Sequence, residues 1–103
     1  MQQFNINIKP NREINTGESL TKLPMILRET IFKWENSQRE KGDKFFIGIE
    51  EIAALLNLHE QTIRKYCNSS NPVYPPVNVL IAICKITNDY TPWNYLNDGI
   101  KND

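Results

Sequence analysis

Apolar side chains recur at helical spacing through much of the chain after residue 20. Between residues 23 and 40, one apolar stripe repeats at intervals of four, four and three residues, the period of a helix that buries one face. Pro24 suits the first turn of such a helix, where a missing N–H has no intrahelical partner. Gly42 is a stop signal just beyond it. We therefore expect a helix over about residues 23–40 with a buried stripe of Leu23, Leu27, Ile31 and Trp34.

The pattern predicts four more helices, of which the first two are described below. A loop punctuated by three prolines between residues 72 and 76 follows them. The next helix runs to about Thr87, and its apolar residues cover two faces, which indicates a buried position. Thr91-Pro92 is a cap and first-turn signal for a last short helix, which Gly99 is expected to close.

The first residues of the chain have a different pattern. Phe4, Ile6 and Ile8 alternate with polar residues, which is the period of a strand. Two interpretations remain open, namely a partly ordered arm and a strand that pairs with a partner chain. We expect an N-terminal arm over residues 1–20 and an all-α, five-helix domain over residues 21–103.

Residues 49–68 match the spacing that a helix-turn-helix requires. Ala53 supplies a small side chain where the two helices cross. Four positions later, Asn57 supplies a residue that tolerates the left-handed backbone of the turn. Ile63, six positions further on, is the apolar residue that the second helix buries. The other apolar positions agree with this assignment: Ile52, Leu56, Leu58 and Tyr66.

If these residues point inward, the outward face of the second helix is defined. We expect Gln61 to pair with adenine and Arg64 with guanine in the major groove, because both side chains offer bidentate hydrogen bonds. Lys65 and Thr62 are expected to contact backbone phosphate, and Glu60 can accept a hydrogen bond from cytosine. The predicted DNA-binding set is His59, Glu60, Gln61, Thr62, Arg64, Lys65 and Asn68.

The same segment resembles the helix-turn-helix of phage repressor and Cro-type regulators. The similarity continues to about residue 97 and is closest in kind to phage regulatory proteins of the CII type, although residues 1–44 have no counterpart. In that type a Thr-Gly-Asp turn is usual, and here Asn88 takes the place of the glycine. The residues that carry the similarity are Ile63-Arg-Lys-Tyr66, Asn71-Pro72, Thr87-Asn88-Asp89 and Leu96.

This resemblance implies a lambda-repressor-like DNA-binding domain and an oligomeric transcription factor of a phage or prophage. We accordingly expect a sequence-specific regulator that reads a double-stranded DNA operator with the helix at 59–68. A homodimer or higher homo-oligomer would bind two half-sites about 34 Å apart. Trp93 and Tyr95 in the last helix are the first candidates for the subunit contact, and the N-terminal strand is the second.

The charge balance of the chain argues against DNA binding and favours a protein-interaction function. Lys plus Arg and Asp plus Glu both number 12, so the net charge is zero, whereas DNA-binding domains often have a basic excess. Residues 45–103, which contain the predicted reading helix, have four basic and six acidic side chains. The alternative is a protein-interaction adaptor or antitoxin-like module that uses the same helical bundle without sequence-specific DNA binding.

Other classes of function have little support. The sequence has no Gly-rich phosphate loop, no metal-type histidine pair and no Gly-x-Ser-x-Gly motif. We therefore expect neither an enzyme nor a site for a cofactor, metal or small molecule. Cys67 and Cys84 lack C-x-x-C spacing, which favours reduced thiols in a cytoplasmic protein. No signal-peptide pattern or membrane-spanning apolar run is visible.

Overall fold

Five α-helices make up the part of the chain that the computed structural model describes, residues 21–101. No strand occurs within this range. The prediction of an all-α domain is therefore confirmed for these residues, whereas the expected arm over residues 1–20 lies outside them. In chain order the helices are α2 (Leu23–Glu40), α3 (Gly48–Leu56), α4 (Glu60–Tyr66), α5 (Val77–Thr87) and α6 (Thr91–Lys101).

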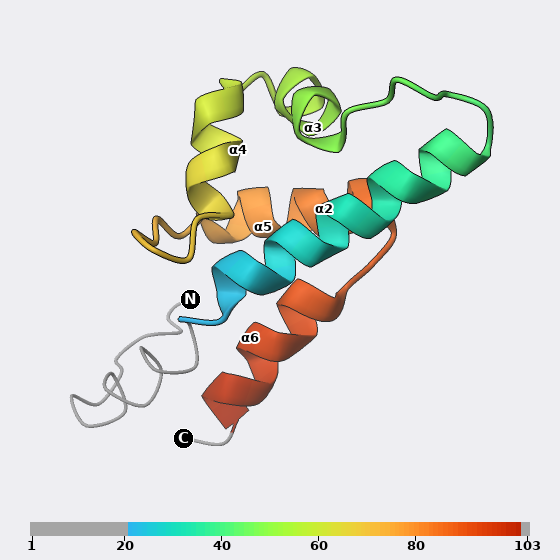
Figure 1. Ribbon diagram of the computed structural model, residues 1–103. Coiled ribbons are helices and arrows are strands. Elements are labelled where there is room, and N and C mark those ends of the chain that lie inside the picture. The colour runs from blue at the N-terminus through green and yellow to red at the C-terminus, as the bar shows by residue number, and fades with distance from the viewer. Residues whose placement is uncertain (1–20, 102–103) are drawn as a thin grey trace.

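The long helix α2 lies across the middle of the domain and packs against α3, α5 and α6 (Figure 1). Its buried face is the stripe that the sequence predicts, with Leu23, Leu27 and Ile31 buried and Trp34 packed against the core. Pro24 occupies the first turn, as expected. Gly42 follows the end of the helix at φ +125°, a backbone conformation that residues other than glycine rarely adopt.

One apolar core joins the helices. Leu27 of α2, Ile52 of α3, Ile63 of α4 and Ile83 of α5 are all fully buried within it. The hydroxyl of Thr87, also buried, donates a hydrogen bond to the carbonyl oxygen of Ile83 at 2.9 Å, so this polar group keeps a partner in the core. The prediction that both apolar faces of α5 are buried holds only in part, because Leu80, Ile83 and Cys84 are buried whereas Val77 is 51% exposed.

Two asparagines end helices in the left-handed conformation, Asn57 after α3 at φ 57° and Asn88 after α5 at φ 56°. In both cases the next residue donates its backbone N–H to the carbonyl oxygen five positions earlier. The distances are 2.9 Å for Leu58 to Ala53 and 3.0 Å for Asp89 to Cys84. This pattern satisfies carbonyl groups that the helix leaves unpaired, and it confirms the predicted turn at Asn57.

The last helix begins where predicted but continues further. The Asp89 carboxylate accepts hydrogen bonds from the Thr91 backbone N–H at 3.0 Å and from its hydroxyl at 2.6 Å. The expectation that Gly99 ends the helix is wrong, because α6 runs to Lys101. A glycine inside a helix costs only about 1 kcal/mol relative to alanine, so it need not terminate one. Within the described range, no helix has both the length and the apolar character of a membrane span.

Candidate nucleic-acid interface

The helices α3 and α4 pack against each other and are joined by a turn of three residues, 57–59. Ala53 is buried where the helices meet, with 4% of its surface exposed. On α4, Ile63 and Tyr66 are buried, and Leu58 of the turn packs against the same core. The predicted burial of these positions is confirmed. One face of α4 is consequently fixed against the domain, and the other is left to solvent.

The start of α3 is held tightly against α2 by Gly48. A Cβ atom at this position would lie 2.9 Å from Cγ2 of Ile31, which is closer than packed carbon atoms come. The backbone N–H of Gly48 also donates a hydrogen bond to Oε1 of Glu35 at 2.9 Å. These two contacts set the position of the α3–α4 pair on the long helix, and the sequence patterns do not reveal them.

The residues predicted to bind DNA lie together along α4 and its two ends. Thr62 is half-buried near the contact with α3, and the other six are exposed. Gln61 and Lys65 are one helical turn apart and lie on the side opposite the buried Ile63. We call Gln61 and Lys65 the α4 stripe. Both side chains are available to a ligand that approaches this face.

The residues at the two ends of α4, His59 and Asn68, also belong to the set predicted to bind DNA. His59 is the N-cap residue, in an extended conformation and without a side-chain cap hydrogen bond. After the helix, Oδ1 of Asn68 accepts a hydrogen bond from the backbone N–H of Ser70 at 2.9 Å. Asn68 therefore shapes the following loop with its oxygen, and its amide nitrogen is the group left for an outside partner.

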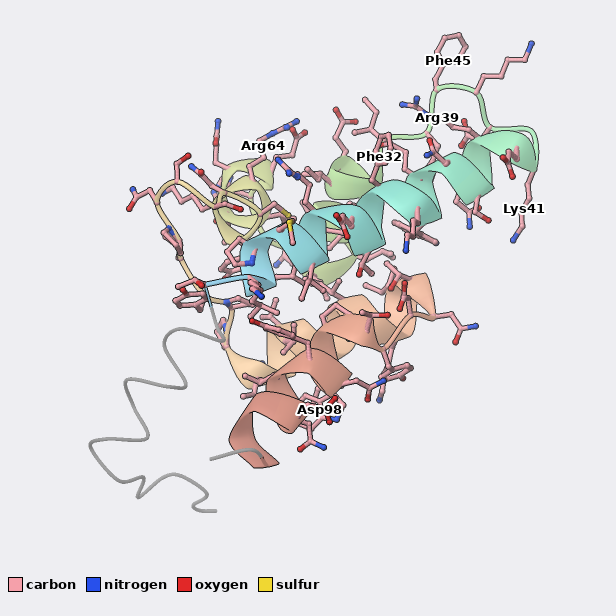
Figure 2. All side chains as sticks on the ribbon, turned by 60° about the horizontal axis from the view of Figure 1, so that its bottom comes forward. Phe32, Arg39, Lys41, Phe45, Arg64 and Asp98 are labelled. Atoms are coloured by element: carbon pink, nitrogen blue, oxygen red, sulfur yellow. The ribbon has the colours of Figure 1, made fainter. Side chains whose placement is uncertain are left out.

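Arg64 lies at the edge of the exposed face, next to α2. Its Nη2 atom is 3.4 Å from Oε1 of Glu60, one turn earlier on the same helix. Both side chains are about half-exposed, so this pair is a weak restraint on the guanidinium group. Arg64 also lines a surface hollow together with Arg28 and Phe32 of α2. Figure 2 shows the Arg64 and Phe32 side chains on the same side of the domain. Arg64 can therefore contact a ligand on the exposed face of α4 or a ligand in the hollow beside α2.

Both cysteine side chains are buried and free. Burial raises the pKa of the Cys67 thiol to about 11, although the nearby Arg28 and Arg64 partly oppose this shift. Burial likewise raises the pKa of the Cys84 thiol. Both thiols stay protonated at neutral pH and are poor nucleophiles. Within residues 21–101, no three histidine, cysteine, aspartate or glutamate side chains are grouped so that they could hold a metal ion.

Sequence reasoning missed Arg28 and Phe32 as neighbours of α4. The signal was weak but present, because the two residues are four apart on α2 and lie off its buried stripe. What the sequence could not supply is the position of α2 relative to α4, since that depends on the contact at Gly48.

Comparison with known proteins gave no matching family model, curated protein or solved structure.

Proposed function

We propose that this protein is a sequence-specific DNA-binding regulator that reads the major groove with α4. The observation that carries the proposal is the α4 stripe: Gln61 and Lys65 project from a helix whose opposite face is fixed by Ile63 and Tyr66. The turn at Asn57 joins this helix to α3 in the left-handed conformation that a helix-turn-helix uses. An α-helix fits the width of the major groove of B-DNA.

The positions of the side chains suggest a division of roles that differs from the sequence-based expectation. Gln61 and Lys65 lie towards the middle of the exposed face, so we assign base contacts to them. Glutamine can form a bidentate pair with adenine, and lysine can donate to guanine. Arg64 lies at the edge and is paired with Glu60, which suits a contact with backbone phosphate.

The neutral net charge is compatible with this proposal if the DNA-facing cations act locally. Arg64 and Lys65 are both exposed on α4. Each phosphate contact releases counterions from the duplex, so even a few such contacts produce a measurable dependence of affinity on salt. We expect moderate affinity and a shallow dependence on salt compared with a strongly basic domain.

We further propose a lambda-repressor-like arrangement of the five helices and a phage or prophage regulator that binds as a homodimer. Symmetric half-sites would then lie about 34 Å apart, one turn of the duplex. Trp93 and Tyr95 both pack against the core of their own chain, which leaves less of either ring for a subunit contact than the sequence suggested. Exposed apolar side chains outside α6 are better placed for a contact between subunits.

Selection from a random duplex pool at low salt tests the proposed function. The expected result is enrichment of one short sequence, with binding that a gel shift confirms and that Gln61→Ala weakens. Static light scattering of the same preparation measures the oligomeric state, and a dimer is expected. Absence of any enriched sequence would contradict the DNA-binding proposal.

A further inference from the structure

A hollow of about 170 Å³ opens on the surface between α2, the start of α3 and α4. We call it the α2–α4 groove. It has no assigned role in the proposed contact with DNA, apart from Arg64 at its edge. Apolar side chains form most of its wall, and two arginines lie at one end. The residues that matter for the argument are Arg28, Ile31, Phe32, Ile47, Ile49 and Arg64.

The apolar wall of the groove is unusually open to solvent. Phe32 is 58% exposed and Ile47 is 38% exposed. Phe45, in the loop after α2, is 88% exposed, and Figure 2 shows it on the same edge of the molecule as Phe32 and Arg64. Phe45 does not line the groove, but Phe32 and Ile47 do, and large apolar side chains exposed in the wall of a hollow are typical of an interaction surface.

The loop that carries Phe45 is anchored to α2 directly after the exposed ring. The neighbouring Phe46 packs edge-on against Trp34, with 4.9 Å between the ring centroids. Nε of Arg39 donates a hydrogen bond to the carbonyl oxygen of Phe46 at 2.9 Å. Phe45 is therefore presented to solvent by a loop whose next residue is held by α2.

The charge of the groove is positive at the end nearest α4. Arg28 and Arg64 both line it, and the one carboxylate in its wall belongs to Glu35. Glu35 is already satisfied, because it accepts a hydrogen bond from the Gly48 N–H at 2.9 Å and lies 3.6 Å from Nη2 of Arg39. An anionic group that enters the groove would therefore meet Arg28, and it would meet Arg64 in competition with the exposed Glu60 carboxylate, which lies 3.4 Å from Nη2 of Arg64.

We propose that the α2–α4 groove binds a peptide segment of a partner protein that carries a large apolar side chain next to aspartate or glutamate. The apolar side chain fills the hollow between Phe32 and Ile47, and the carboxylates pair with Arg28 and Arg64. The combination distinguishes a protein partner from nucleic acid. A DNA backbone could satisfy the arginines, but it has no large apolar group to cover the exposed rings.

This inference does not depend on DNA binding. Neither Gln61 nor Lys65 of the α4 stripe lines the groove. Arg64 lies between the two surfaces and borders both. A protein bound in the groove would lie next to any duplex bound to α4, and the two ligands would compete for Arg64. The test below uses peptides alone, and its failure would leave the proposed DNA contact standing.

The experiment is a selection of short random peptides displayed on phage against the full chain, with the best peptide then synthesised and its affinity measured by fluorescence anisotropy. The expected peptides combine a leucine, isoleucine or phenylalanine with adjacent acidic residues. Phe32→Ser and Arg28→Ala should each weaken binding by about tenfold, which corresponds to about 1.4 kcal/mol. Amide chemical shifts should move at Phe32, Ile47 and Arg64 when the peptide is added.

Val77→Ser is the matched control for Phe32→Ser, because Val77 is a similarly exposed apolar residue (51%) at the start of α5 and does not line the groove. Lys85→Ala is the corresponding control for Arg28→Ala. Far-UV circular dichroism of all four variants verifies the fold. The proposal is overturned if no peptide is enriched, if the enriched peptides bind Phe32→Ser as tightly as the wild type, or if random-sequence duplex DNA shifts the groove amides and the peptides do not.

Discussion

Nη2 of Arg64 and Oε1 of Glu60 lie 3.4 Å apart on adjacent turns of α4, so this helix carries its own acidic partner for the cation at its edge. This pairing reduces the positive charge that α4 offers to a polyanion. It also keeps the arginine near its own helix when no ligand is bound. The relationship leads directly to a first prediction.

Glu60→Gln should raise the affinity of the protein for random-sequence duplex DNA by about 1.4-fold to fivefold. This range follows from the free energy of an exposed ion pair, which is roughly 0.2–1 kcal/mol. Anisotropy titrations at several salt concentrations would measure both the affinity and its salt dependence. Glu40→Gln, which removes the same charge from the far end of α2, is the control. An equal gain in both variants would mean that net charge, and not release of Arg64, is responsible.

The conformation of Asn57 predicts an unusual order of stabilities. Because its φ is 57°, Asn57→Gly should leave the free energy of unfolding nearly unchanged or raise it slightly. Asn57→Ala should lower it by about 1 kcal/mol, since a left-handed backbone is costly for residues with an ordinary side chain. Urea denaturation followed by circular dichroism measures the difference. A more stable Asn57→Ala protein would refute the assigned turn.

Gly48→Ala should destabilise the domain by about 1–3 kcal/mol, the usual cost of forcing an extra carbon into a packed contact. The new methyl group would clash with Cγ2 of Ile31, 2.9 Å away. Chemical denaturation again provides the measurement. Asn78→Ala, an exposed first-turn position of α5, should show no comparable loss. If Gly48→Ala is as stable as the wild type, the close approach of α3 to α2 is not present in solution.

Acid should weaken the start of α6. The hydrogen bonds from Thr91 hold the pKa of the Asp89 carboxyl below its ordinary value of 3.8. A carboxyl with a lowered pKa in the folded state stabilises the fold above its unfolded pKa, and this contribution is lost as the pH falls through the folded value. The loss is therefore expected at and below about pH 3.8.

Asp89→Asn keeps an oxygen that can accept from Thr91 but removes the titrating group. Thermal unfolding across the acid range should consequently show a smaller loss of stability below pH 3.8 for this variant than for the wild type. Asp98→Asn, which makes the same change in charge on the exposed part of α6, is the control. Parallel pH profiles for Asp89→Asn and the wild type would exclude the proposed role of this carboxylate.

Local patterns were sufficient for much of the fold. The stripe of Leu23, Leu27 and Ile31 predicts α2 because burial on one face and helical period are both properties of neighbouring residues. Asn57 was recognisable as a turn because few residues tolerate a left-handed backbone. In both cases the structure follows from chemistry within one or two helical turns.

The parts that sequence reasoning missed all depend on contacts between distant segments. Nothing near Gly48 in the sequence indicates that Ile31 will lie against it. Packing between distant helices also decides that Arg64 borders the groove while Lys65 is exposed. The exposure of Phe45 had no signal in the sequence either, because an aromatic residue in a short loop belongs to no periodic pattern.

The most direct test of the central claim is the ratio of affinities for the enriched duplex and for a shuffled duplex of the same composition. For the wild-type protein the enriched duplex should bind at least about 10³ times more tightly, the lower end of typical specific recognition. Gln61→Ala should reduce the discrimination by about 1–3 kcal/mol through the loss of a base contact, and Lys85→Ala should leave it unchanged. Equal affinity of the wild type for both duplexes, or full discrimination by Gln61→Ala, would contradict the assignment of α4 as the reading helix.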